Sequence, residues 1–380
     1  MHLSPRMLDR LHTHGAAILL ALVLPVMLVA PIATGILERF DYPVHRELAW
    51  NFAWPAHFLY HLALTAFRAA TGDWILAQRL LLLANYAALG VILYMFLAQS
   101  VQTKRRLPIL ALLAVSLTFV YAIPGLFQMD GQLYFGYIAL NVFHNTTSLL
   151  LKPIIVLHLL WLYLWLSGER HVGTGFLFIG ALLVVLSALA KPSYLVVLLP
   201  AVFLLTARDQ HAWRSALLAI FLPGVAVLAW LFLNTFGSGG GGGLAFAPLK
   251  VMTHFTEPWT ILPKTVLSLL FPLIMLAVLG RQVLADRLTV LCWLMLLFGL
   301  AYGLLLAETG ERVFDGNWLW SGQLGAFSLF VANTRLLLDN TRQSVSSWRL
   351  TLAWMVFSCH LVAGLAWYLL QYQTDPTLFW

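Results

Sequence analysis

Long apolar runs alternate with short polar segments along most of the 380-residue chain. A helix that crosses a bilayer needs roughly 20 predominantly apolar residues. The pattern predicts about eleven transmembrane helices, at 15–36, 74–97, 109–127, 147–166, 173–190, 193–207, 215–236, 264–280, 288–307, 318–338 and 349–370. The predicted fold class is therefore all-α, a polytopic membrane protein, with residues 1–380 as a single membrane domain.

Composition supports a membrane environment. Hydrophobic residues make up 61% of the chain and charged residues 10%, against about 45 to 50% and about 25% in an average soluble domain. A soluble protein of this composition could not cover its surface with polar side chains. The net charge of +7 comes from basic residues at the ends of apolar runs, which is typical of topology signals rather than of nucleic-acid binding.

The basic residues also orient the chain. Arg6 and Arg10 precede the first apolar run, so we expect residues 1–14 in the cytoplasm. Segment 56–70 is apolar enough for a further span, but a crossing there would place the basic cluster 104–106 outside. We therefore expect it on the membrane surface, as the second of two interfacial helices in a first outer loop at 37–73.

This orientation places most acidic residues on the non-cytoplasmic face. Ten of the fifteen acids are expected there, although acids contribute little to orientation. The excess points to chemistry on that face. The predicted location is a bacterial inner (plasma) membrane, with a periplasmic or extracytoplasmic active site.

The first outer loop carries the densest group of ionisable residues. We interpret Asp41 as a general base, because burial near a low-dielectric surface raises the pKa of a carboxyl group toward the working pH. Glu38 is the second catalytic candidate. The alternative is structural, with Asp41 capping an interfacial helix.

The histidines of the same loop are candidates for substrate binding. Pro55 is expected to start the second short helix, which would place His57 and His61 on one face at i and i+4. Such a pair can also bind a divalent metal, although histidines are common at membrane interfaces. His45 is a further substrate-binding candidate in this loop.

Further substrate-binding candidates lie in the later outer loops. His144 and Asn145 precede a predicted span that holds Lys152, where the helix N-terminus and the cation both favour a phosphate. Lys191 lies in a very short turn and needs an anionic partner, either a lipid phosphate or an acid of the outer face. Arg312 and Trp318 flank an acidic loop that suits sugar hydroxyls and equally suits an interfacial aromatic belt.

A glycine run opens the long outer loop at 237–263. It lacks the GK[ST] ending of a phosphate-binding loop, so the sequence gives no nucleotide site there. A flexible linker and a hinge for a lid are the two remaining interpretations.

Several short motifs of the first hundred residues resemble those of the GT-C class of integral-membrane glycosyltransferases. These are the acidic Asp41 in the first outer loop, the proline-led segment 55–59, the glycine turn 72–73 and the Ala-Gln-Arg-Leu start of the next run at 77–80. The adjacent acidic pair common in the class is absent, and its double proline is reduced to Pro55.

This resemblance implies transfer of a hexosyl or pentosyl unit from a polyprenyl-phosphate donor to a lipid-linked or cell-surface glycan, in cell-envelope polysaccharide biosynthesis. Asp41 would accept the proton of the acceptor hydroxyl, with inversion at the sugar. Lys191, Lys152 or Arg312 would stabilise the departing phosphate. A divalent cation, Mg²⁺ or Mn²⁺, is an alternative source of that charge, although the sequence assigns no metal ligands.

Two other functions remain as alternatives. A surface-polysaccharide polymerase of the O-antigen type has many spans and an outer site, but we would expect its large functional loops in the second half of the chain. A lipid or solute transporter or flippase would carry ionisable residues or broken helices at mid-membrane. The sequence places charges at span ends, which favours the transferase.

Overall fold

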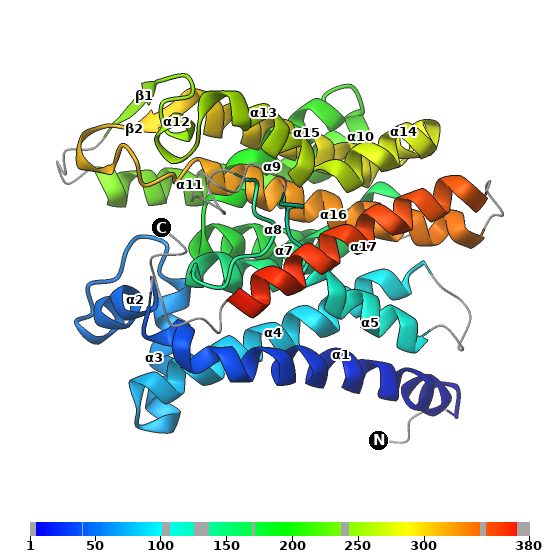
Figure 1. Cartoon of the computed structure of the whole chain (residues 1–380), viewed down its shortest axis with the longest axis horizontal. Coiled ribbons are helices and arrows are strands. Elements are labelled where there is room, and N and C mark those ends of the chain that lie inside the picture. Colours follow the sequence, from blue (N-terminus) through cyan, green and yellow to red (C-terminus); the bar gives the residue numbers. More distant parts are fainter. Residues whose placement is uncertain are drawn as a thin grey trace.

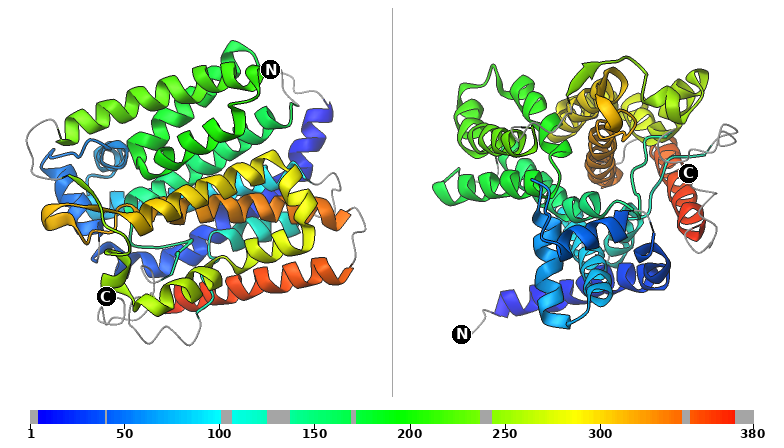
Figure 2. Two further views of the ribbon diagram at one scale, coloured as in Figure 1. Left: turned by 90° about the horizontal axis from the view of Figure 1, so that it is seen from above. Right: turned by 90° about the vertical axis from the view of Figure 1, so that its left-hand side faces the viewer.

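A computed structural model describes residues 5–39, 41–100, 107–124, 137–168, 172–236, 243–342 and 347–370. Helices make up most of this part of the chain, which confirms the all-α fold class. The long helices run along a common direction (Figures 1 and 2). They are α1 (Pro5–Leu37), α4 (Trp74–Ala98), α5 (Leu107–Leu117), α7 (Thr146–Leu166), α8 (Thr174–Ala190), α9 (Ser193–Thr206), α11 (Leu222–Phe236), α14 (Leu270–Ala285), α15 (Arg287–Leu305), α16 (Leu319–Arg342) and α17 (Ser347–Leu370).

Six helical segments of the described chain are long and apolar enough to cross a membrane. They are His14–Leu37, Trp74–Ala98, Thr146–Leu166, Ala212–Thr235, Arg287–Leu305 and Trp348–Leu369. A seventh span results if the helical segment Pro258–Ser268, which contains α13 (Ile261–Ser268), and α14 are counted together; the two meet at a bend of 57°. These features define a multi-pass membrane protein of helical architecture.

The predicted count of eleven spans is not confirmed. Helices α5, α8 and α9 form where the apolar runs predict them, but with 11, 17 and 14 residues they are short against the roughly 20 that a crossing needs. The 24-residue α16 is not among the apolar spans. Its central turns are buried among other helices, so polar side chains there meet protein groups rather than lipid.

Segment 37–73 forms two short helices, α2 (Asp41–Trp50) and α3 (Leu59–Thr71). The expected start of the second helix at Pro55 is wrong, because α3 begins four residues later and segment 53–58 is not helical. With 13 residues, α3 is shorter than the roughly 20 residues that a crossing needs.

A non-helical segment, 137–145, lies inside the bundle and leads into α7. All its residues are buried. Buried backbone without helical hydrogen bonds needs other partners, and the Asn141 side chain supplies some by donating to the carbonyls of Leu117 and Val120 at 3.1 and 2.7 Å. The segment thereby holds Asn145 in the interior.

Helix α16 packs closely against α15 through paired glycines. A Cβ atom on Gly299 would come within 2.6 Å of the Gly322 backbone, so the two helices approach at a distance that larger residues exclude. This packing fixes the first turns of α16, where Trp320 faces the functional site described below.

The short elements gather at one end of the bundle. Helices α2 and α3, α12 (Met252–Phe255) and the antiparallel strands β1 (Leu244–Phe246) and β2 (Leu306–Glu308) share it (Figure 1). We call it the loop end. At the opposite end, Asp286 in the turn before α15 pairs with Arg335 of α16.

Candidate functional site

The side chain of Asn145 joins Asp41 to Lys191 at the loop end. Its Nδ2 donates to Oδ2 of Asp41 at 2.9 Å, and its Oδ1 accepts from Nζ of Lys191 at 3.0 Å. The same Oδ1 accepts from the backbone N–H of Ser148 at 2.9 Å and caps α7. A carboxylate and an ammonium group are therefore held on the two sides of one side-chain amide.

Two contacts of Tyr42 fix the first turn of α2, which carries Asp41. The Tyr42 hydroxyl donates to the carbonyl of Phe143 at 3.0 Å. From α4, Nε2 of the buried Gln78 donates to the Tyr42 carbonyl at 2.9 Å and to the Tyr60 hydroxyl at 3.1 Å. The carboxylate is thus positioned by segment 137–145 and by α4 together.

Lys191 lies in the turn between α8 and α9, outside both helices. Its Nζ sits 4.2 Å from the centroid of the Trp320 ring, a distance that favours a cation. Burial lowers the pKa of Lys191 to about 7, although the Asp41 charge acts in the opposite direction. The group therefore titrates near neutral pH.

Burial has the corresponding effect on the carboxyl group. It raises the pKa of Asp41, against the lowering effects of the Lys191 charge and the Asn145 hydrogen bond. A carboxylate with a raised pKa binds a proton more readily near neutral pH, which suits a general base.

Four histidines lie at or near this group. Nδ1 of His45, one helical turn after Asp41, lies 3.0 Å from Nε2 of His61, and the His144 ring lies 6.0 Å from the Trp320 ring. Burial lowers the pKa of His45 and His144 to about 3 and of His57 and His61 to about 4. The imidazoles are therefore neutral near pH 7.

The predicted i, i+4 arrangement of His57 and His61 is wrong. His57 precedes α3, so the two rings do not share a helix face, and His61 pairs with His45 instead. Within the described ranges, no three His, Cys, Asp or Glu side chains come together as a metal-ion set.

The structure separates Glu38 from the Asp41 group. Its side chain is 55% exposed and forms an ion pair with Arg46 at 3.4 Å. Arg46 also donates to Gln78 Oε1 at 3.2 Å. The geometry therefore favours Asp41 over Glu38 as the reacting carboxylate.

Lys152 lies deeper in the bundle, on the second turn of α7. It is buried, its Nζ donates to Oδ1 of Asn141, and it sits 5.0 Å from the centroid of the Phe327 ring. Asn145 and Lys152 are seven residues apart on one helix, which separates their backbones by about 10 Å along its axis. Lys152 is thus a second buried cation beside the site rather than a member of the Asp41 group.

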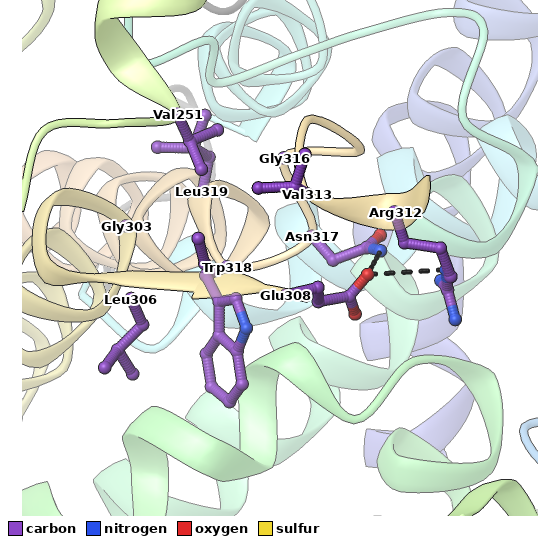
Figure 3. Close-up of a pocket in the computed structure, with 11 residues that line it drawn as sticks. Val251, Gly303, Leu306, Glu308, Arg312, Val313, Gly316, Asn317, Trp318 and Leu319 are labelled. Atoms are coloured by element: carbon purple, nitrogen blue, oxygen red, sulfur yellow. Dashed lines mark hydrogen bonds and ion pairs between the residues drawn. The ribbon is translucent and has the colours of Figure 1, made fainter. Parts of the chain in front are cut away.

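Arg312 and Trp318 lie in the turn that connects β2 to α16. Arg312 Nε contacts Glu308 at 3.3 Å and Asp315 at 3.0 Å, and Glu308 also accepts from Asn317 at 3.1 Å (Figure 3). Two carboxylates thus balance the Arg312 charge. Lys191 has no such carboxylate contact among the described residues, so it is the better phosphate ligand of the two.

Sequence reasoning missed the residues that position the site. Tyr42, Gln78, Asn141 and Trp320 are not among the predicted site residues. Gln78 and Asn141 did carry a signal, since each is an uncharged polar residue in an apolar stretch and must find internal partners. The glycine run at 237–242 lies outside the described residues.

Comparisons of this chain with protein-family models, with curated proteins and with solved structures found no match.

Proposed function

We propose that the chain is a membrane glycosyltransferase that moves a sugar from a polyprenyl-phosphate donor to a lipid-linked or cell-surface glycan on the non-cytoplasmic face. The observation that carries this proposal is the Asp41–Asn145–Lys191 arrangement. It holds a proton acceptor and a cation at one place, each bound to a neutral amide rather than to the other. The resemblance of the first hundred residues to GT-C enzymes supports the same function.

The two charged groups serve opposite sides of the reaction. Asp41 accepts the proton of the acceptor hydroxyl as that oxygen forms a bond to the anomeric carbon. The bond between the anomeric carbon and the phosphate oxygen breaks, and its electron pair stays on the phosphate. Lys191 stabilises the added charge. Attack opposite to the departing phosphate inverts the sugar.

The neutral histidines suit the same reaction. His45, His57 and His144 lie near Lys191, since its charge contributes to lowering the pKa of each. Neutral imidazoles both donate and accept hydrogen bonds. They can therefore bind sugar hydroxyls without adding charge that would compete with Lys191 for the phosphate.

The proposal is tested by sugar transfer in lipid nanodiscs from a set of polyprenyl-phosphate sugars. We expect Asp41→Asn to lose about 10²- to 10⁴-fold in turnover, the usual contribution of a general base. Glu38→Gln is the matched control, because it neutralises an acid of the same loop that contacts Arg46, and it should keep most activity. Full turnover in a normally folded Asp41→Asn variant would refute the assigned chemistry.

A transporter or flippase is the second candidate, favoured by two observations. Helices α13 and α14 form a broken pair with a bend of 57°, and Lys152 is a buried cation inside an apolar helix. Both features are typical of substrate pathways through membranes. Movement of an intact lipid-linked sugar across the bilayer, without transfer, would favour this function.

A further inference from the structure

A second polar group lies in the turn between β2 and α16. Glu308, Arg312, Asn317 and Trp318 line a small hollow there together with apolar residues of β2, α15 and α16 (Figure 3). The hollow has room for little more than one water-sized group. We call it the hydroxyl pocket.

The charges of this pocket do not suit a phosphate. The Glu308 carboxylate accepts from Asn317 Nδ2 at 3.1 Å and contacts Arg312 Nε at 3.3 Å. Arg312 also contacts Asp315 at 3.0 Å. Arg312 is thus already paired with two carboxylates, of which Glu308 lines the hollow. This excess of negative charge around the arginine repels an anion, while it favours a hydrogen-bond donor such as a hydroxyl group.

The Trp318 indole provides an independent sign of a missing ligand. Its Nε1 is buried and has no hydrogen-bond partner among the described residues. Buried N–H groups without an acceptor are uncommon, because each loses its bond to water and gains nothing. The ring is held by the Tyr302 ring at 6.0 Å. A hydroxyl oxygen bound in the pocket would accept a hydrogen bond from this N–H group.

Hydrogen bonds anchor the segment that carries the pocket, which lies at the loop end of the bundle. Thr309 exchanges two hydrogen bonds with Gly243, at 2.9 and 2.7 Å, and β2 pairs with β1. The Arg312 charge contributes to lowering the pKa of His57, which also responds to Lys191. Strand β2 and helix α2, which carry Glu308 and Asp41, both lie at the loop end (Figure 1).

We propose that the hydroxyl pocket binds one hydroxyl group of a neutral sugar and so selects the sugar that the protein accepts. The Glu308 carboxylate accepts a hydrogen bond from this hydroxyl group, and the Trp318 indole N–H donates one to its oxygen. The remainder of the sugar ring stays outside the hollow. The role in substrate selection rests on the proposed transfer reaction, whereas binding itself requires no turnover.

The test measures binding of methyl glycosides of common hexoses and pentoses, and of their monodeoxy derivatives, to the full chain in nanodiscs by saturation-transfer NMR. We expect at least one glycoside whose affinity falls about tenfold when a single hydroxyl is removed, as for the loss of one hydrogen bond to a charged group. Glu308→Gln and Trp318→Phe should each reduce this preference.

Asp315→Asn is the matched control, since Asp315 contacts the same arginine but does not line the hollow. It should keep the wild-type preference. An unchanged preference in folded Glu308→Gln and Trp318→Phe variants would overturn the proposal, as would an absence of glycoside binding by the wild-type chain.

The outcomes separate this inference from the proposed function. If the wild-type chain transfers sugar and Glu308→Gln keeps the same sugar preference in transfer, the pocket assignment fails and the transferase stands. If glycosides bind with the expected preference and nothing is transferred, the transferase fails and the pocket stands. Asp41→Asn should lose transfer and retain glycoside binding.

Discussion

Two buried cations at opposite ends of the bundle, Arg335 and Lys191, have different partners. At the end opposite the loops, Arg335 pairs directly with Asp286 and Asp339, and Arg287 pairs with Asp209. At the loop end, Asp41 and Lys191 form no direct ion pair within the described parts of the chain, and Asn145 lies between them. Direct pairing satisfies charges and stabilises a fold, whereas a neutral spacer leaves both groups free to react.

The largest expected effect is a loss of stability at the end of the bundle opposite the loops. Arg335 is buried, so Arg335→Met leaves two carboxylates without their cation and should cost about 3 to 5 kcal/mol of the free energy of unfolding. Turnover per folded molecule should not change, because the loop end keeps its geometry. Thermal unfolding in detergent, followed by activity at equal folded concentration, checks both points. A turnover defect at full stability would contradict the contrast between the two ends.

A smaller effect is expected when the spacer is removed. Asn145→Ser retains an N-cap for α7 but cannot both donate to Asp41 and accept from Lys191. We expect a loss of about 10- to 100-fold in turnover, the usual range for hydrogen bonds to charged groups. Asn340→Ser is the control, since that buried amide at the opposite end donates to the Leu336 carbonyl. Equal effects of the two substitutions would show that Asn145 only supports the fold.

The smallest effect concerns pH. Activity should fall at low pH as Asp41 binds a proton, and it should fall above about pH 7 as Lys191 loses its charge. The second limb amounts to about tenfold per pH unit. Lys191→Arg should abolish it, because arginine stays charged. A wild-type basic limb that persists unchanged in Lys191→Arg would exclude Lys191 as its source.

The lowered pKa of Lys191 also determines the direction in which stability changes with pH. The pKa of Lys191 is lowered from 10.5 to about 7 on folding, so the unfolded chain binds more protons between these values. The contribution of Lys191 to the free energy of unfolding therefore rises with pH across this window. Asp41, whose pKa is raised by burial, contributes in the opposite sense, and its contribution falls as pH rises through its folded pKa.

The apolar pattern predicts where the helices lie, but it does not establish how many of them cross the membrane. Each predicted span has a helix near its position because hydropathy reports burial, but hydropathy does not tell whether lipid or protein provides it. Helix α16 shows the limit, since its buried turns carry Ser328, Asn333 and Thr334 with hydroxyls and amides bonded to its own carbonyls. The sequence of such a helix is less apolar, although the helix lies in the centre of the bundle.

Candidate residues were predicted singly, and their grouping was not. Asp41, Asn145 and Lys191 were each singled out by charge or position, but they lie far apart in the sequence. Their meeting depends on the path of segment 137–145 and on the Tyr42 and Gln78 contacts, which no local pattern encodes. The predicted helix position of His57 is wrong for a local reason: Pro55 does not start the helix, and α3 begins only at Leu59.

The most direct measurement of the central claim uses proteoliposomes supplied on one face with a polyprenyl-phosphate donor labelled in the sugar, together with a lipid-linked glycan acceptor. The account predicts that the wild-type chain moves label to the acceptor on that face, with inversion of the anomeric carbon. It also predicts that Asp41→Asn binds donor but forms product about 10²- to 10⁴-fold more slowly. Label that crosses the bilayer on its original lipid, with no acceptor labelled and no effect of Asp41→Asn, would contradict it.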